Sequence, residues 1–598
     1  MIAPMTKYSF VLLNGQQDQL VEQLQQLGLI DISRSVKPVD EASQQLASDL
    51  DRIRGLVQGL RKVDIPEGTQ LRECPQEEDL VRLAEGTLML YSETRGQIAG
   101  LEKEIAAKKI WGNFDPDVLE KLSEAGVPLH FHQLSGKLFR QQWEQEYALS
   151  VVAREKNNTY FVVAGEDPLP GEIPVPSGNA AQAESALAEK EALLHRLEGE
   201  ILGIQQQIPQ LEDRLRELYA RLDRHLACVS ASPAAENTIV TLVGYAPTDQ
   251  EGEVTRALDH SDVLYLKEDA QVRDNPPIQL KNNAFVKQFE VLTDMYGRPG
   301  YDGFDPTPFI AVFFLLFFAL CMGDAGYGLI LIAIGLLLKK IDSFKDMSSL
   351  VVTLGVGTVV VGFFLHTFFS IDIAQWKIFQ PVQFLFLPEE IAGYAGGMVL
   401  SIVVGIVHLC LAMSVKAIHS VKVNGFAASL GTLGWTLLIV GGVIVGALAL
   451  VGVLNATATK WIVIVIGIVS AIGIFPLNNP NRNKLANVGL GLWDTYNTAT
   501  GLLGDVLSYL RLYALGLAGS MLGMAFNDMG KMVLGDGSSP ILWVPFILLV
   551  LVGHTLNIAM CALGAFVHPL RLNFLEFFKN SGYEATGRNY NPLKKQTK

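Results

Sequence analysis

The fold of this chain follows from one apolar stretch, Gly504-Asp505-Val506-Leu507-Ser508-Tyr509-Leu510-Arg511-Leu512-Tyr513-Ala514-Leu515-Gly516-Leu517-Ala518-Gly519. A helix through this stretch can lie in a bilayer, where a charge such as that of Arg511 costs from about 2.5 to over 10 kcal/mol. Arginine cannot shed its proton in a protein, so neutralisation does not relieve this cost. Asp505 lies six residues back and on another face of the helix, which makes it a poor partner. We therefore expect Arg511 to meet a carboxylate on another element; the alternative is an arginine that extends to the membrane interface.

Two regions of different composition make up the 598 residues. The chain is charged and rich in Glu, Gln and Leu up to about Asn283, whereas Phe309 to Phe578 is mostly long apolar runs. A net charge of −14 without a basic patch argues against nucleic-acid binding. The five cysteines show neither metal-site spacing nor a disulfide framework. The N-terminus lacks the pattern of a signal peptide, so we expect the soluble region to stay in the cytosol.

The periodicity of the first region predicts a cytosolic arm over residues 1–283, with two α/β lobes joined by a long antiparallel coiled coil. We expect the proximal lobe to combine residues 1–35 and 236–275, and the distal lobe to cover residues 113–170. The coiled coil would pair residues 40–110 with 180–228, because Leu and Ile recur every three or four residues between Leu194 and Leu222. Pro209 falls inside the second helix and predicts a kink. The alternative is two unrelated domains with a linker helix.

The second region predicts an eight-helix transmembrane domain over residues 307–579, after a linker at 284–306 and before a cytosolic tail at 580–598. We interpret residues 307–338 as a tight hairpin that turns at Gly323-Asp324-Ala325-Gly326. Four further apolar runs, near 349–369, 395–415, 426–453 and 461–477, are long enough to span. The last two, near 486–527 and 541–578, are longer than a core of about 30 Å requires, so they must tilt or protrude.

Loop charges support eight spans with both termini in the cytosol, because cytoplasmic loops carry an excess of Lys and Arg. The loops after even-numbered spans hold Lys339, Lys340, Lys345, Lys416, Lys422, Arg482, Lys484, Lys579, Lys594, Lys595 and Lys598. The loops after odd-numbered spans hold only Lys377, Lys460 and Lys531, beside Asp372, Glu389, Glu390, Asp528 and Asp536. A six-span arrangement would lose this asymmetry.

A second basic residue, Arg571, lies in the final apolar helix within His568-Pro569-Leu570-Arg571-Leu572. Glu576 lies five residues further and off the face of Arg571, whereas His568 is close to that face. Two helices that each carry an unpaired arginine favour a polar path through lipid over structural contacts alone. The alternative for Arg571 is a position near the cytosolic end of its helix.

Other chemistry is not indicated by the sequence. No G-x-x-x-x-G-K-[ST] nucleotide cradle occurs, so we expect a non-catalytic chain without a cofactor or metal. His366, His408 and His554 each stand alone on an apolar segment, which favours packing histidines over ligands.

The sequence resembles the membrane stator subunit of rotary V/A-type ATPases, called subunit I in bacteria and archaea and subunit a in eukaryotes. The resemblance covers the whole chain and rests on Ser508-Tyr509-Leu510-Arg511-Leu512 and on His568-Pro569-Leu570-Arg571-Leu572 with Glu576. Supporting segments are Met295-Tyr296-Gly297, Gly323-Asp324-Ala325-Gly326-Tyr327-Gly328, Trp111-Gly112-Asn113-Phe114 and Gly244-Tyr245-Ala246-Pro247.

The resemblance implies that Arg511 and Arg571 lie between two ion half-channels, against a rotating proteolipid ring whose subunits each carry an essential carboxylate. It makes His568, Asp505, Glu576 and Asp324 candidate residues of the half-channel walls. The chain departs from the eukaryotic pattern, in which we expect a histidine at Gly519 and acidic residues at Asn497 and Cys561. The half-channel walls and the identity of the ion, proton or sodium, therefore stay open.

The resemblance also implies partners and a location. Peripheral stalk subunits would bind the cytosolic lobes, the soluble ATPase sector would connect through the stalks, and the chain would be a multi-pass protein of a bacterial plasma membrane. Two hypotheses of other classes are a self-contained secondary transporter with a cytosolic coiled-coil regulatory arm and a membrane-anchored scaffold. The first would need inverted repeats with broken helices, of which no convincing example is present. The second leaves Arg511 unexplained.

Overall fold

A computed structural model describes residues 1–598 except 14, 35–36, 67, 73–78, 112–115, 137, 156–157, 166–168, 175–179, 235–237, 260–262, 342–343, 375, 377, 379, 389, 392, 478–483, 536–539 and 595–598. Predictions that concern Gly112 to Phe114, Lys377, Glu389, Arg482, Asp536, Lys595 or Lys598 lie outside the described residues. The chain forms two compact units. The first holds Met1–Val11, Leu29–Ile32 and Thr241–Pro592, and the second holds Leu12–Gly28, Ser33–Val240 and Leu593–Lys598.

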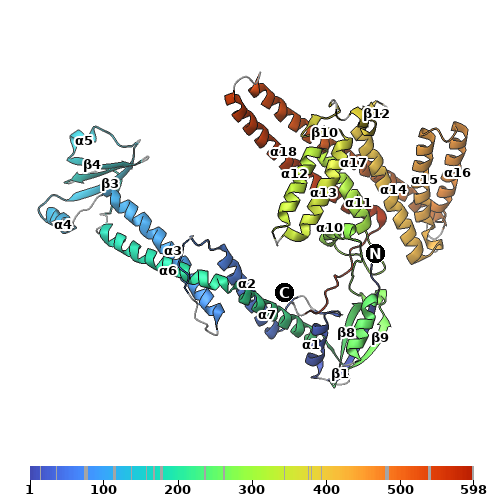
Figure 1. Ribbon diagram of the computed structural model, residues 1–598, viewed down its shortest axis with the longest axis horizontal. Helices are drawn as coiled ribbons and strands as arrows, with labels where there is room; N and C mark the ends of the chain where they lie inside the picture. The colour runs from blue at the N-terminus through green and yellow to red at the C-terminus, as the bar shows by residue number, and fades with distance from the viewer. Residues whose placement is uncertain are drawn as a thin grey trace. The chain divides into compact units, whose positions relative to one another are not determined.

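Long helices dominate the second unit. They are α1 (Gln17–Leu27), α2 (Glu41–Lys62), α3 (Leu80–Trp111), α6 (Ala180–Gln206) and α7 (Ile208–Val229). Helix α3 lies beside α6 and α2 beside α7, as Figure 1 shows. Their shared core includes Leu60, Ile201, Ile204 and Leu211, all almost completely buried. The helices thus pack along each other as the repeated Leu and Ile predict, while the coiled-coil geometry itself stays a prediction.

Pro209 divides the returning helix more completely than a kink would. Helix α6 ends at Gln206, and α7 begins at Ile208 with the proline in its first turn. Proline is tolerated there because the first N–H groups of a helix have no partner within the helix.

A four-stranded sheet also belongs to the second unit and contacts α3. Its strands are β3 (Leu129–Ser135), β4 (Leu149–Glu155), β5 (Asn158–Ala164) and β6 (Glu172–Ile173), in the order β4-β5-β3-β6. Two short helices, α4 (Pro116–Glu124) and α5 (Trp143–Glu146), accompany it. Phe161 and Val163 fill its core.

Another sheet joins segments from both ends of residues 1–283. Strands β1 (Met5–Leu13), β2 (Asp31–Ile32), β8 (Ile239–Pro247) and β9 (Leu264–Asp269) follow the order β2-β8-β1-β9, and β7 (Ser232–Ala234) pairs with β8. Strand β1 pairs with β9 in antiparallel register from Thr6–Asp269 to Val11–Leu264. The side chains of Tyr8 and Phe10 are fully buried. Helix α8 (Glu251–Leu258) precedes β9.

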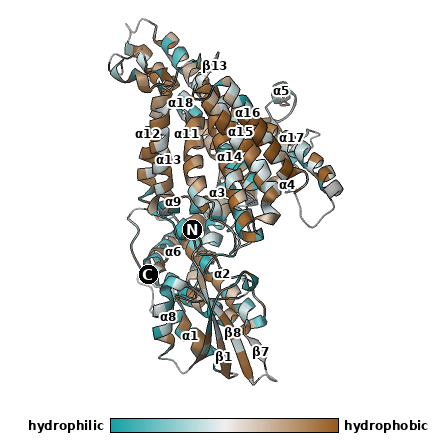
Figure 2. Cartoon of the chain, turned by 90° about the vertical axis from the view of Figure 1, so that its right-hand side faces the viewer, coloured by the Kyte–Doolittle hydropathy of each residue, from teal (hydrophilic) through white to brown (hydrophobic). Residues whose placement is uncertain are grey.

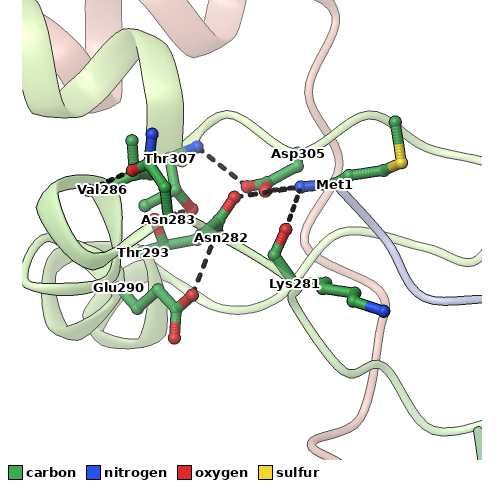
Figure 3. A network of polar contacts seen from close by, with 9 residues as sticks. All are labelled: Met1, Lys281, Asn282, Asn283, Val286, Glu290, Thr293, Asp305 and Thr307. Atoms are coloured by element: carbon green, nitrogen blue, oxygen red, sulfur yellow. Dashed lines mark hydrogen bonds and ion pairs between the residues drawn. The ribbon is translucent and has the colours of Figure 1, made fainter.

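Polar contacts around Asp305 connect the start of the chain to the segment before the first apolar helix (Figure 3). The Met1 ammonium group lies 2.5 Å from Asp305 Oδ2, and the Thr307 N–H donates to Asp305 Oδ1 at 3.0 Å. Burial alone would raise the pKa of Asp305, but the bonds from the ammonium group and from Thr307 outweigh it and lower the pKa. Helices α9 (Ala284–Lys287) and α10 (Glu290–Tyr296) lie in the same segment.

Eight apolar helices follow, and they hold most of the hydrophobic residues in Figure 2. They are α11 (Thr307–Met322), α12 (Ala325–Leu338), α13 (Lys345–Phe364), α14 (Gly396–Asn424), α15 (Leu430–Leu450), α16 (Ala456–Ile474), α17 (Lys484–Leu534) and α18 (Trp543–Arg571). A π-helix (Leu572–Phe577) and α19 (Phe578–Ser581) extend α18. Six spans are long and apolar enough to cross a membrane within the described residues, and α11 and α12 are shorter apolar helices. The count of eight spans therefore stays a prediction.

Consecutive apolar helices run antiparallel wherever close approaches define their register. Helix α12 meets α13 where Gly328 faces Val359 and Gly335 faces Val352. These glycines let the two backbones approach, because a Cβ atom at Gly328 would lie 2.7 Å from the Val359 nitrogen. Helices α15 and α16 are antiparallel by the same criterion, with Gly434 against Ser470 and Gly473 against Leu430.

The segment after α19 returns to the sheet that contains β2. Tyr583 donates its hydroxyl to the Gly297 carbonyl at 2.6 Å, and the Asn591 N–H donates to Asp31 at 3.0 Å. Strands β10 (Thr367–Phe368) and β11 (Ile371–Asp372) form a hairpin that contacts the other ends of α12 and α13. Short strands β12 (Glu390–Ile391) and β13 (Tyr394–Ala395) precede α14. We call the end of the helices near Asp305 and Tyr583 the tail end, and the end near Phe369 the hairpin end.

Candidate functional site

Arg511 lies near the middle of α17, a helix of 51 residues. Its side chain is half-buried, and no acidic group lies within 4.0 Å of it among the residues that the structure describes. Gly504, Leu507, Ala514 and Ala518 follow the same helix face at steps of three and four, and all four are exposed. Arg511 therefore lies partly covered on a helix face whose neighbouring apolar and small residues are exposed.

Arg571 occupies the last position of α18, where the backbone changes to the π-helix. It is exposed and, within the described part of the chain, has no acidic partner within ion-pair distance. It belongs to an exposed stripe at steps of three and four that comprises Leu556, Met560, Leu563, Val567 and Leu575. Single π-helical turns occur often at functional sites.

His568 lies near enough to both arginines for their charges to act on its imidazole, so Arg511 and Arg571 come into the same region from two helices. The Nδ1 atom of His568 is buried and has no hydrogen-bond partner among the described residues. A buried polar atom of this kind needs a partner such as water, a ligand or another subunit.

Asp505 has a local structural partner. The residue is 9% exposed, and its carboxylate accepts a hydrogen bond from Asn580 Nδ2 at 2.9 Å. The Lys579 ammonium group lies 3.6 Å from the other carboxylate oxygen. The charge of Asp505 thus serves the junction between α17 and α19, and its role in an ion path stays a prediction.

Glu576 is the buried acid nearest to Arg571 in sequence. It lies in the π-helix at 5% exposure, and its Oε2 atom has no hydrogen-bond partner in the described chain. A buried carboxylate oxygen without a donor is costly, which makes this position a candidate for ion or proton exchange.

Asp324, by contrast, is fully bound by backbone groups. It caps α12 through the N–H groups of Gly326 (2.8 Å) and Tyr327 (3.2 Å). It also accepts from the N–H groups of Phe369 (2.8 Å) and Ser370 (2.5 Å) in the β10–β11 hairpin. This geometry favours a structural role, and a place for Asp324 in a half-channel wall stays a prediction.

Sequence reasoning missed a polar cluster at the hairpin end of α17 and α18. His554 Nδ1 lies 2.7 Å from the Tyr327 hydroxyl, and His554 Nε2 lies 2.9 Å from Asn527 Oδ1. Asn557 Nδ2 donates to the same hydroxyl and to the Gly519 carbonyl, both at 2.8 Å. The spacing of His554, Asn557 and Cys561 at steps of three and four was the signal that could have found this stripe. His408, in turn, is buried among aromatic rings and bonded to Tyr509 at 2.9 Å, as expected of a packing histidine.

Known proteins show sequence similarity to this chain. Residues 179–353 match the V-type ATPase 116kDa subunit family. V-type ATP synthase subunit I 1 of Treponema pallidum is 25% identical over the full length of both chains. A-type ATP synthase subunit I of Methanocaldococcus jannaschii is 33% identical over 55% of this chain and half of that relative's length.

Similarity to this family is thus shown over residues 179–353, and similarity to a V-type ATP synthase subunit I extends over the whole chain. The segment that matches the family runs from the beginning of α6 into α13, so it contains neither arginine. A solved structure, the cytoplasmic N-terminal domain of subunit I, a homologue of subunit a of V-ATPase, covers 44% of this chain at 16% identity. Its TM-score of 0.19 is too low to establish a common fold.

Proposed function

We propose that this chain belongs to the V-type ATPase 116kDa subunit family and is the membrane stator of a rotary V/A-type ATPase, which forms two ion half-channels against a proteolipid ring. One observation carries the proposal. Arg511 and Arg571 come from adjacent helices, share the neighbourhood of His568, and face outward without an acidic partner in the described chain. A permanent charge on an apolar surface needs a compensating carboxylate, and a passing ring subunit supplies one.

The fixed guanidinium group explains how the ring site would release its ion. A carboxylate that faces lipid favours its protonated or ion-bound form, whereas an opposite charge within about 4–6 Å lowers its pKa by about 1–3 units. Each unit corresponds to about 1.36 kcal/mol. Arg511 thus favours release from each passing site and blocks a direct leak between the half-channels.

The surrounding polar groups divide between the two ends of the helices. Glu576 and Asp505 lie toward the tail end, and the cluster around Tyr327 lies toward the hairpin end. With the tail end in the cytosol, the first group would border the cytosolic half-channel and the second the opposite one. The segments before α11 and after α19 meet at one end of the bundle, which requires an even number of crossings and supports two cytosolic termini.

The long helices of the second unit and the two lobes of the cytosolic arm would then resist torque. Peripheral stalk subunits would bind these lobes, and the stalks would connect the stator to the soluble ATPase sector, where ATP is hydrolysed or made. The chain itself would be non-catalytic and would lie in a bacterial plasma membrane.

The test is to replace Arg511 in the complete complex. Arg511→Ala should leave the complex assembled, because the partner of the residue is a moving ring site, and should reduce ATP-driven ion uptake into vesicles to background. Arg511→Lys should also be badly impaired, because lysine lacks the planar bidentate fork. Lys531→Ala is the matched control, since Lys531 is an exposed cation of the same helix that pairs with Asp528. Assembled Arg511→Ala complexes that still transport would contradict the proposal.

A further inference from the structure

The polar cluster at the hairpin end is a continuous hydrogen-bonded chain inside an apolar bundle. It starts at Asn527 on α17, passes through His554 on α18 and Tyr327 on α12, and reaches Asn557 on α18. Asn557 then donates to the carbonyl of Gly519, eight residues from Arg511 along α17. Polar residues at membrane depth are costly and therefore mark functional sites by default.

The hydrogen-bond partners determine which atoms of this polar cluster carry the protons. The amide nitrogen of Asn527 donates to the Phe369 carbonyl at 2.9 Å, so its Oδ1 atom is the acceptor that faces His554. His554 must then carry its proton on Nε2 and accept at Nδ1 from the Tyr327 hydroxyl. The Tyr327 oxygen in turn accepts from Asn557. Each nitrogen of the His554 ring thus has a partner on a different helix, with Nδ1 toward α12 and Nε2 toward α17.

His554 is the candidate for proton exchange in this cluster, because imidazole is the side chain whose unperturbed pKa lies near neutral. Asp324 lies close by, but its two oxygens are occupied by four backbone N–H groups, two of which hold the Phe369–Ser370 turn. That turn has φ values of 49° and 57° at Phe369 and Ser370, a region that residues other than glycine rarely adopt. Loss of the Asp324 charge would release the turn, so Asp324 suits a fixed wall better than a carrier.

We propose that His554 is the proton-carrying residue of the half-channel at the hairpin end, with Tyr327 as its inner partner and Asn527 as its outer partner. The inference rests on the proposed function and deepens it, because it identifies the ion that passes through this half-channel as a proton. Imidazole suits the task, since it is the only side chain whose unperturbed pKa lies between about 5 and 8.

The transfer step conserves protons and bonds. A hydronium ion from the ring side gives a proton to the Tyr327 oxygen and becomes water, while the original hydroxyl proton moves to His554 Nδ1. Because the Asn527 amide oxygen is too weak a base to take a proton, the imidazolium gives its Nε2 proton to a water molecule on the outer side, which forms hydronium and leaves a neutral ring protonated at Nδ1. Rotation of the ring or exchange with water restores the Nε2–H form. The opposite direction of transport reverses each step.

Few charged groups surround His554. From α12 it faces the Asp324 carboxylate and the Tyr327 hydroxyl. From α17 it faces the neutral Asn527, and from the hairpin the ring of Phe369 at 5.8 Å. Among the described residues, Asp324 is therefore the compensating charge when His554 is protonated.

The experiment compares His554→Gln with His554→Phe in the complete complex, reconstituted into vesicles and assayed for ATP-driven proton uptake. Glutamine can keep a hydrogen bond in the cluster but cannot carry a proton. We expect both variants to assemble on a native gel and to lose at least about tenfold in uptake, in line with the loss of a proton-transfer group. The residual uptake should no longer depend on the pH of the compartment at the hairpin end between about 5 and 8.

A matched control and a second variant keep the outcomes separate. The control is His366→Gln, which changes another histidine of the hairpin end. His366 pairs with Asp372 at 3.0 Å and does not belong to the polar cluster, so this variant should transport normally. Tyr327→Phe removes the inner partner and should also slow uptake. Wild-type uptake by His554→Gln, or an unchanged pH profile, would show a structural role only and overturn the inference. If Arg511→Ala blocks transport while His554→Gln does not, this inference fails and the proposed function stands.

Discussion

Arg511 and Asp505 lie six residues apart on α17, and their surroundings give the two charges different tasks. Asp505 is buried and bound by Asn580 and Lys579, so its partners come from the same chain. Arg511 has no acidic partner within 4.0 Å in the described chain, which is what a contact with a moving subunit requires. At the scale of the residue, the presence or absence of a partner within the chain separates structural charges from candidate functional ones.

Asp505→Asn tests whether the charge of Asp505 is used in transport. Asparagine can still accept the hydrogen bond from Asn580, so the complex should assemble with a thermal stability close to that of the wild type. Asp505→Ala removes one of the two acceptors of the Asn580 amide nitrogen, which keeps its bond to the Glu576 carbonyl, and should destabilise the complex by about 1–3 kcal/mol. Thermal unfolding of the purified complex and proton uptake should be measured together. Normal stability with lost uptake in Asp505→Asn would place the charge in the ion path.

Asp40 provides a pH test at the start of α2. Hydrogen bonds from Ser43 and from His225 lower the pKa of Asp40 to about 2. Because this value lies below the unfolded value of about 4, the stabilisation is present above about pH 4 and is lost as the pH falls through about 2. Asp40→Asn still caps the helix but does not titrate. The protection of the first-turn amides of α2, measured as their exchange rate relative to that of unfolded amides at the same pH, should no longer change with pH in this variant. An unchanged pH dependence of the protection would assign it to another group.

At the scale of the element, α17 and α18 are held close by a glycine opposite a cysteine. A Cβ atom at Gly519 would lie 2.5 Å from Cys561 Sγ. In the eukaryotic pattern that this chain resembles, we expect a histidine and an acidic residue at these two positions. The two departures from that pattern thus lie against each other.

Gly519→Ala should separate the two helices and destabilise the complex by about 1–3 kcal/mol, the usual cost of overpacking. The double variant Gly519→Ala with Cys561→Ala removes the sulfur atom that the new methyl group meets, and it should recover most of the lost stability. Thermal unfolding of the four proteins of this cycle gives the coupling energy. Equal losses in the single and double variants would contradict the proposed contact.

At the scale of the whole molecule, the two ends of the apolar region meet on one side. Met1 binds Asp305, which lies just before α11. Tyr583, which lies just after α19, binds Gly297, which also precedes α11. An even number of crossings follows, and the loop charges favour eight. The tail end then faces the side with the basic loops.

Accessibility of introduced cysteines tests this topology. In a background without reactive native cysteines, Lys422→Cys at the end of α14 should be protected from an impermeant thiol reagent in intact cells. Ile378→Cys, at a site that is 79% exposed between α13 and α14, should react. Permeabilised cells are the control in which both should react. Labelling of Lys422→Cys from outside would contradict eight spans with cytosolic termini.

The sequence by itself determined the features that depend on local periodicity and composition. Apolar length predicted the helices, the Leu and Ile repeat predicted the packing of α2 and α3 against α6 and α7, and the cost of a buried charge singled out Arg511. Only the tertiary structure decided which polar groups meet. Asp505 finds Asn580, Asp324 finds the Phe369–Ser370 turn, and His554 finds Tyr327 across 227 positions of sequence. The physical reason is that a hydrogen bond acts over about 3 Å, so the partner of a side chain depends on how distant helices pack, which no local pattern contains.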